Sequence, residues 1–227
     1  MRNTCVGADD PYYSHLRMSL LDLVDGSPKR VLEIGCGHGQ TLAFLKRERL
    51  AEFVAGVELV PEVAAIARRN PEVDLVLTGD VEHLSLEFPV GYFDLIIASH
   101  VLEHVKDPWS LTRQLGLLTN PEGQFIGSLP NVRNATVSFP LVLFGKLEYT
   151  QEGILDWTHT KFFTKATIEN LLRSTGFAVC KIEPEFSSRL EAVNAMSFGL
   201  FKNFLCFTYN FSARPAVRTV APKLGPE

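Results

Sequence analysis

The sequence predicts an α/β fold built on a parallel β-sheet with helices on both faces. Short runs rich in Val, Ile and Leu alternate with helical patterns up to about residue 129, and the first run leads into a glycine-rich turn. Strands this apolar are buried on both faces, which is typical of parallel sheets. Because the chain has 227 residues and 46% of them are hydrophobic, we expect a single domain over residues 1–227.

The expected strands of the first part occupy residues 30–34, 53–59, 73–78, 92–98 and 123–129. Between them, helical patterns cover residues 40–47, a stretch that Pro61 can open at its first turn, and a stretch that ends near Leu118. After Pro130 the alternation stops. Residues 131–163 form a long aromatic-rich segment with only short helical possibilities, which we interpret as a substrate-side insertion, since such loops are usually functional.

The last part of the chain returns to regular structure. Thr164 is a suitable N-cap for a helix over residues 164–174, and Gly176 is a suitable stop. Residues 177–184 and 208–213 are the expected final strands.

The most informative segment is VLEIGCGHG, residues 31–39, in which a strand meets Gly35, Gly37 and Gly39. Glycines here permit a tight turn and close approach of a ligand to the backbone. Glu33 would repel the pyrophosphate that a dinucleotide places on such a loop, and the G-x-G-x-G spacing also departs from the dinucleotide pattern. A carboxylate would instead attract the sulfonium and ammonium groups of S-adenosylmethionine. This disfavours a nicotinamide dehydrogenase.

Two further acids follow the next strands of the predicted sheet. Glu58 ends the second strand, where it can accept hydrogen bonds from ribose hydroxyls, and Asp80 follows the third, where it can accept one from an adenine amino group. Each alone could be a solvated loop carboxylate. Together with Glu33 they lie where open α/β sheets bind ligands, and they predict a cofactor site.

The motifs VLEIGCGHG, GVEL, TGDVEHL and FDLIIASHVLEHVKDP resemble successive motifs of the class I S-adenosylmethionine-dependent methyltransferases, over residues 30–118. The resemblance implies methyl transfer from S-adenosylmethionine, with S-adenosylhomocysteine as product. It also implies a Rossmann-like, doubly wound sheet of seven strands with the last strand antiparallel. The positions implied for cofactor binding are Glu33, Gly35, Cys36, Gly37, Gly39, Glu58, Leu59, Asp80, Val81, Ser99 and His100.

Two later segments indicate which kind of molecule accepts the methyl group. SLPNVRN and GILDWTHTKFFTKATIENLLRSTGF resemble a subset of these enzymes that accompanies glycan and cell-surface polysaccharide assembly. The expected acceptor is therefore a hydroxyl of a sugar, a glycan precursor or another small metabolite. N- or C-methylation of an amine or a quinone-like ring is the alternative, and so is a catalytically inactive cofactor-binding protein.

A hydroxyl acceptor needs a base to take its proton, and histidine suits this task near neutral pH. His159 is the preferred base, with Asp156 near enough in sequence to orient it; otherwise His159 only shapes the lid. His100 is the second candidate, unless Ser99 and His100 line the cofactor pocket only through their backbone.

The run His100-Val101-Leu102-Glu103-His104 also matches the H-x-x-E-H pattern of a zinc protease family. The pattern is short and directly follows a strand of a nucleotide-type domain, so we expect no metal and treat His104 as a packed helix residue. Asp94, inside the fourth strand, is expected to be structural.

Charge and composition exclude other classes. A net charge of -4 with scattered basic residues gives no electrostatic footprint for nucleic acid. The four cysteines lie far apart and are expected to be reduced thiols. We expect no secretory signal in residues 1–10 and no membrane span in residues 193–211, with peripheral membrane association left open; a cytoplasmic location follows by default.

Phe198, Phe201, Phe204 and Phe207 recur every three residues, and Phe211 follows. They could form an aromatic surface for a lipid-linked acceptor, a membrane interface or a partner subunit. The favoured interpretation is a buried helix leading into the last strand, since these side chains are enough to cover one sheet edge.

Overall fold

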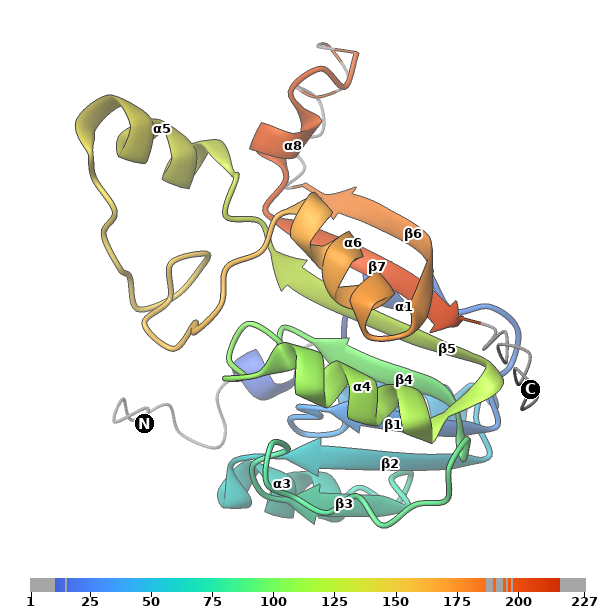
Figure 1. Cartoon of the computed structure of the whole chain (residues 1–227). Coiled ribbons are helices and arrows are strands. Elements are labelled where there is room, and N and C mark those ends of the chain that lie inside the picture. The colour runs from blue at the N-terminus through green and yellow to red at the C-terminus, as the bar shows by residue number, and fades with distance from the viewer. Residues whose placement is uncertain are drawn as a thin grey trace, which may run out of the picture.

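A computed structural model describes residues 11–14, 16–186, 190, 194, 196 and 198–216. Its strands form one seven-stranded sheet in the order β3-β2-β1-β4-β5-β7-β6 (Figure 1). β7 runs antiparallel to both of its neighbours, whereas β1 to β5 pair in parallel, so the predicted Rossmann-like sheet is confirmed. The strands are β1 (Arg30–Ile34), β2 (Phe53–Glu58), β3 (Leu75–Thr78), β4 (Phe93–Ser99), β5 (Thr119–Pro130), β6 (Phe177–Glu185) and β7 (Thr208–Pro215).

The helices begin at local signals that the sequence carries. At α4, the Asp107 carboxylate accepts a hydrogen bond from the Ser110 amide, and Pro108 follows in the first turn. At α6, Thr164 forms a capping box with Thr167, which confirms the prediction that Thr164 is the N-cap. The helices are η1 (Pro11–Ser14), α1 (Met18–Leu21), α2 (Gln40–Arg47), α3 (Pro61–Arg68), α4 (Pro108–Leu118), α5 (Ala135–Phe144), α6 (Lys165–Ser174) and α8 (Lys202–Leu205).

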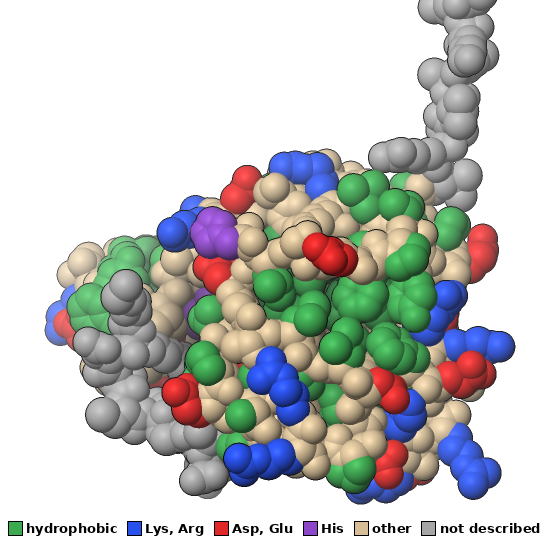
Figure 2. Space-filling view, turned by 90° about the horizontal axis from the view of Figure 1, so that it is seen from below, with side chains coloured by type: hydrophobic (Ala, Val, Ile, Leu, Met, Phe, Trp, Pro, Cys, Tyr) green, Lys and Arg blue, Asp and Glu red, His purple; other side chains and the backbone are tan. Residues whose placement is uncertain are grey.

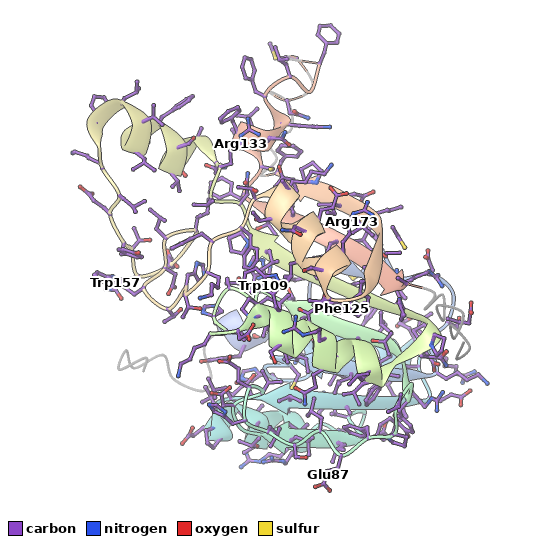
Figure 3. The ribbon with its side chains drawn as sticks, in the orientation of Figure 1. Glu87, Trp109, Phe125, Arg133, Trp157 and Arg173 are labelled. Atoms are coloured by element: carbon purple, nitrogen blue, oxygen red, sulfur yellow. The ribbon has the colours of Figure 1, made fainter. Side chains whose placement is uncertain are left out.

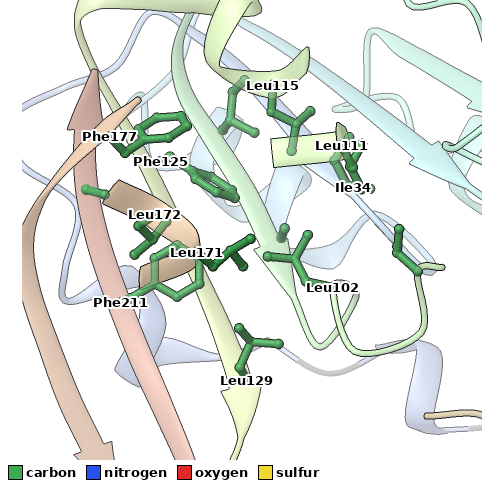
Figure 4. Packing of buried hydrophobic residues seen from close by; sticks show 14 of the residues in the cluster. Ile34, Leu102, Leu111, Leu115, Phe125, Leu129, Leu171, Leu172, Phe177 and Phe211 are labelled. Atoms are coloured by element: carbon green, nitrogen blue, oxygen red, sulfur yellow. The ribbon is translucent and has the colours of Figure 1, made fainter. Parts of the chain in front are cut away.

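Two hydrophobic clusters cover the two faces of the sheet. One joins α4 and α6 to the sheet, with Phe125 at 5.2 Å from Phe177 and 5.1 Å from Phe211 between ring centroids (Figure 4). The other joins α1, α2 and α3 to the opposite face. Successive side chains of a strand point to opposite faces. On β1, Leu32 therefore packs in the first cluster and Val31 in the second, and Glu33 faces the same side as Val31.

The insertion after β5 stands beyond the carboxyl ends of the strands, where α5 and the loop that follows it project from the sheet (Figure 1). The sequence predicted only short helical possibilities here, yet α5 extends over ten residues despite Pro140 inside it. Five of its large hydrophobic side chains are exposed: Phe139, Leu141, Val142, Leu143 and Phe144. The insertion is thus an apolar arm over the end of the sheet at which open α/β folds bind ligands.

The prediction of a buried phenylalanine helix before β7 is wrong for the residues that the structure describes. Phe198 is 99% exposed, Phe201 51% and Phe207 40%, and of the five phenylalanines only Phe211 is fully buried. Phe198 and Gly199 have positive φ angles of 51° and 74°, which interrupts any helix at this point. The helix that follows, α8, has four residues.

Other predictions concern single residues and the surface. Asp94 is structural, because its carboxylate accepts hydrogen bonds from the Arg30 amide (3.0 Å) and the Asn120 side chain (3.2 Å). Cys36, Cys180 and Cys206 are free thiols, while Cys5 lies outside the described residues. Figure 2 shows a face on which acidic and basic side chains are interspersed around a hydrophobic centre.

Residues 1–10, on which the prediction about a secretory signal was made, also lie outside the described residues, as does part of the 193–211 stretch. Across the described part of the chain, we find no helix with the length and apolar character needed to cross a bilayer.

Candidate functional site

A pocket lies at the carboxyl ends of β1 and β4, under the N-terminal segment. Glu33, Gly35 and Gly37 line it from β1 and the glycine turn, and Ser99 and His100 line it from the end of β4. The structure thus brings five of the predicted cofactor residues together. Tyr13, Arg17 and Leu20, from the segment before β1, also line the pocket.

The glycine turn leaves no room for side chains. Gly35 and Gly37 have φ angles of 71° and 54°. A Cβ on Gly37 would lie 2.5 Å from the Tyr13 carbonyl oxygen, and one on Gly35 would lie 2.8 Å from a methyl carbon of Val101. The Tyr13 carbonyl also accepts a hydrogen bond from the His38 amide at 2.9 Å. The N-terminal segment is therefore fastened directly onto the turn, a contact that the sequence did not predict.

Two of the predicted cofactor residues, Cys36 and Gly39, pack against the interior of the protein. The Cys36 side chain points into the core, where a Cβ on Gly56 would come within 2.5 Å of its sulfur, so only the backbone of Cys36 belongs to the turn. Gly39 precedes α2 and packs against Val73, to which an added Cβ would approach within 3.1 Å.

Glu33 is the most unusual group of the pocket, because it is an acid that is only 5% exposed. Burial raises the pKa of its carboxyl to about 8, an effect that a hydrogen bond from Thr41 opposes and the nearby charge of Glu58 reinforces. One carboxyl oxygen, Oε2, has no hydrogen-bond partner in the described chain. A cationic ligand in the pocket would supply the missing partner and favour the charged form, whereas a diphosphate would be repelled.

Glu58 lies at the end of β2 and is also buried. Its Oε2 accepts a hydrogen bond from the Gly37 amide at 3.0 Å, and its Oε1 accepts one from the Val60 amide at 2.9 Å. Glu58 therefore holds the glycine turn in place. Each carboxylate oxygen retains a further lone pair, which ribose hydroxyls could use.

The remaining predicted cofactor residues follow β2 and β3, the strands next to β1. Leu59 is exposed just beyond Glu58, and Val81 is buried after β3. Asp80 is exposed, and its Oδ1 accepts a hydrogen bond from the Glu82 amide at 2.9 Å. Leu59 and Asp80 are thus exposed at neighbouring strand ends, whereas Val81 packs in the core cluster, and their predicted role in binding the adenosine stays a prediction.

His100 occupies the end of β4 with a left-handed backbone, φ 54°. Its Nδ1 lies 3.1 Å from Oε1 of Glu103, a carboxylate only 1% exposed. Burial alone would raise the pKa of Glu103, but the hydrogen bond with His100 and the charges of His100 and His104 outweigh it, so the pKa is lowered. In its neutral form, His100 would keep its proton on Nδ1 beside the ionised Glu103. The lone pair would then lie on Nε2, which is buried without a hydrogen-bond partner in the described residues.

His159 and Asp156 lie in the insertion, arranged differently from the predicted pair. The described contacts of the Asp156 carboxylate go to the Thr158 amide at 2.7 Å and the Thr158 hydroxyl at 2.6 Å. That hydroxyl lies 3.0 Å from Nδ1 of His104. His159 Nδ1 lies 2.8 Å from the Ile154 carbonyl oxygen. Asp156 is thus connected to His104 through Thr158, and its predicted role in orienting His159 stays a prediction.

A groove of about 470 Å³ runs along the insertion. Val137, Pro140, Leu155 and Phe207 give it apolar walls, and Ile154, whose carbonyl faces His159, lines it too. Near it, the exposed Trp157 marks the tip of the loop in Figure 3 and stacks on Tyr149 with ring centroids 5.2 Å apart.

The insertion is attached to the loop after β4. The amides of Thr160 and Lys161 both donate to the Glu103 carbonyl, at 2.8 and 3.1 Å. The rings of His104 and His159 lie 4.8 Å apart. The groove and the pocket are therefore linked through the insertion: Ile154 is hydrogen-bonded to His159, the next two residues are hydrogen-bonded to the backbone of Glu103, and the Glu103 carboxylate is hydrogen-bonded to His100.

Comparison with known proteins decides the family. A family model described as "Methyltransferase domain" matches residues 9–182, well over half of the chain. The chain belongs to this family. It is a class I S-adenosylmethionine-dependent methyltransferase, and S-adenosylmethionine is its cofactor. Two features of the site fit that cofactor: the buried Oε2 of Glu33 has no hydrogen-bond partner in the described residues, and the glycine turn has no room for side chains.

The methyltransferase is similar to curated proteins named ubiquinone biosynthesis O-methyltransferase. The protein from Neisseria meningitidis is 27% identical over 206 residues, which cover 86% of this chain and 83% of the relative. The one from Xanthomonas euvesicatoria is 30% identical over 181 residues, 77% of this chain and 68% of the relative. A crystal structure of an S-adenosylmethionine-dependent methyltransferase from Mesorhizobium loti has the same fold, with a TM-score of 0.63 at 20% identity, covering 92% of this chain and 98% of that one. These names lend no support to polysaccharide assembly.

Proposed function

We propose that the methyltransferase transfers its methyl group to a hydroxyl oxygen of a small ring-bearing molecule and that His100 takes the hydroxyl proton. The observation that carries the proposal is the buried Nε2 of His100, which has no hydrogen-bond partner in the described chain and lines the cofactor pocket. A base whose other nitrogen is fixed by a buried carboxylate is the arrangement that catalytic dyads and triads use.

The acceptor class is inferred from the groove and from the relatives. The relatives are named O-methyltransferases, which favours oxygen as the methylated atom. The apolar walls of the groove and the stacked pair Tyr149 and Trp157 suit the face of a ring. A phenolic ring of the quinol type is our first choice, and a sugar hydroxyl, as the SLPNVRN segment suggested, is the second.

Each part of the protein has a distinct task in this proposal. Bound S-adenosylmethionine would supply the methyl group, which the acceptor oxygen would take in an in-line displacement with S-adenosylhomocysteine as the leaving group. Glu33 holds the cationic end of the cofactor, Glu58 holds the ribose and the glycine turn, and the segment around Tyr13 keeps water out. Positioning of donor and acceptor alone can contribute up to about 7–11 kcal/mol. We treat residues 1–227 as one domain whose insertion, residues 131–163, forms the acceptor side.

A panel of matched acceptors tests the proposal. The full chain would be incubated with S-adenosylmethionine and an ortho-diphenol, the corresponding ortho-diamine or a methyl hexoside, with S-adenosylhomocysteine release and product mass as readouts. We expect the diphenol to be methylated on oxygen and the diamine to be inert. Methylation of the diamine alone would favour the N-methyltransferase alternative, and cofactor binding without turnover on any acceptor of a wide panel would favour the inactive binding protein.

A further inference from the structure

Three potential metal ligands converge where the insertion meets the loop after β4. One ligand atom each from Glu103, His104 and His159 lies within 4.8 Å of the other two. The sequence pattern H-x-x-E-H suggested a different set, on a helix, but α4 begins only at Pro108 and His100 faces Glu103. His159 joins the cluster because the Thr160 and Lys161 amides fasten the insertion to the Glu103 carbonyl.

Both imidazoles are oriented in the way that metal-binding histidines usually are. His104 Nδ1 lies 3.2 Å from the Thr158 carbonyl oxygen, and His159 Nδ1 lies 2.8 Å from that of Ile154. A neutral histidine that donates its Nδ1 proton to a carbonyl carries its lone pair on Nε2, and the hydrogen bond fixes the direction of the ring, as it does in metal-binding histidines. The Thr158 hydroxyl, itself held by Asp156, supports His104 from the same side.

Glu103 provides the anionic member of the cluster and an independent indication of a ligand. Its Oε1 is engaged by His100 at 3.1 Å. Its Oε2 is buried and has no hydrogen-bond partner among the described residues. A buried carboxylate oxygen left without a partner costs free energy, and a cation bound beside His104 and His159 would remove that cost.

We infer that Glu103, His104 and His159 bind one divalent transition-metal ion of the Zn²⁺ type. Two imidazoles and one carboxylate suit Zn²⁺ better than Mg²⁺, which prefers oxygen ligands. Three protein ligands leave a fourth position of a tetrahedral ion open, as in catalytic zinc sites.

The metal site lies between the acceptor groove and the cofactor pocket, so its open coordination position could bind the acceptor, an inference that rests on the proposed function. Ile154, the hydrogen-bond partner of His159, lines the acceptor groove, and His100, the partner of Glu103, lines the cofactor pocket. A metal between the two would hold the acceptor's hydroxyl oxygen and lower the pKa of that hydroxyl.

Metal binding is tested directly on the full chain, without reference to turnover. Metal-free protein would compete with a chromophoric chelator for Zn²⁺, and Co²⁺ would be added separately to record its visible spectrum. We expect one ion per chain, an intense four-coordinate Co²⁺ spectrum, and Zn²⁺ affinity at least 100-fold weaker in His159→Gln and in Glu103→Gln. The Thr158→Val variant should lose about 10- to 100-fold, since it removes the support of His104. His83→Gln, at an exposed histidine outside the cluster, is the matched control and should bind as wild type does.

Binding of S-adenosylhomocysteine to each variant verifies that it is folded. Failure of the wild type to take up Zn²⁺, a weak six-coordinate Co²⁺ spectrum, or equal Zn²⁺ affinity in His159→Gln and wild type would each overturn the inference. If a metal-free protein methylates hydroxyl acceptors at full rate, the proposed function survives and the role of the metal fails. If Zn²⁺ binds at these residues but no hydroxyl acceptor reacts, the metal site survives and the proposed function fails.

Discussion

Glu33→Gln should weaken S-adenosylmethionine binding and, at alkaline pH, stabilise the cofactor-free protein. The amide keeps the size of the side chain but cannot form a charge-assisted hydrogen bond with the ammonium group of the cofactor. Such bonds contribute about 1.5–3 kcal/mol, so we expect the dissociation constant to rise on the order of 10- to 100-fold.

The effect on stability follows from the raised pKa of Glu33. In the folded, cofactor-free protein the pKa of its carboxyl is about 8, against 4.5 for an ordinary glutamate. Between these values the folded state binds more protons than the unfolded state, so this group lowers the free energy of unfolding as the pH rises from about 4.5 to about 8. Ionising it in its buried site costs up to about 5 kcal/mol, and the glutamine variant avoids this cost above pH 8.

Chemical denaturation of both proteins at pH 5 and pH 9 measures this difference, with Glu62→Gln, at an exposed position of α3, as control. The stability of wild type should fall relative to Glu33→Gln between the two pH values, while the control follows wild type. Parallel behaviour of wild type and Glu33→Gln would show that Glu33 is not buried as the structure has it.

His100→Asn should lower turnover by about 10²- to 10⁴-fold while leaving the affinity for S-adenosylhomocysteine within roughly threefold of wild type. Asparagine tolerates the left-handed backbone of this position, so the variant removes the imidazole with little added strain. The loss is expected in kcat, because the proton is taken during methyl transfer.

Turnover of His100→Asn would be measured beside that of His159→Gln and of the surface control His83→Gln. A His159→Gln variant that loses all turnover while His100→Asn stays near wild type would exclude His100 as the base. If that His159→Gln variant still binds Zn²⁺, the role of base returns to His159, as the sequence favoured. Retention of turnover in both would mean that no base is needed, as for an amine acceptor that is already neutral.

The sequence was informative where the structure is decided locally. The predicted helix over residues 40–47 has those bounds, Thr164 caps α6, and the acids expected at strand ends lie there, because periodicity, caps and strand ends are set by neighbouring residues. The glycine turn can likewise be predicted from the sequence, because few residues other than glycine adopt its positive φ angles.

Contacts between distant segments escaped prediction. Nothing in the local pattern places Tyr13 on the glycine turn, or joins Asp156 to His104 through Thr158. His159 lies near Glu103 only because the insertion folds back onto the loop after β4. The spacing of residues in the sequence does not predict that contact. The phenylalanine repeat failed for a related reason: a period of three fits a helix, but the backbone at Phe198 turns left-handed and leaves the rings exposed.

Calorimetric titration of the purified chain with S-adenosylhomocysteine and, separately, with NADH tests the central claim most directly. The acidic pocket around Glu33 predicts saturable binding of S-adenosylhomocysteine at one site per chain and no heat from NADH. At a hundred times its dissociation constant, S-adenosylhomocysteine should also stabilise the fold by about 2.7 kcal/mol. Saturable binding of NADH together with no response to S-adenosylhomocysteine would contradict it.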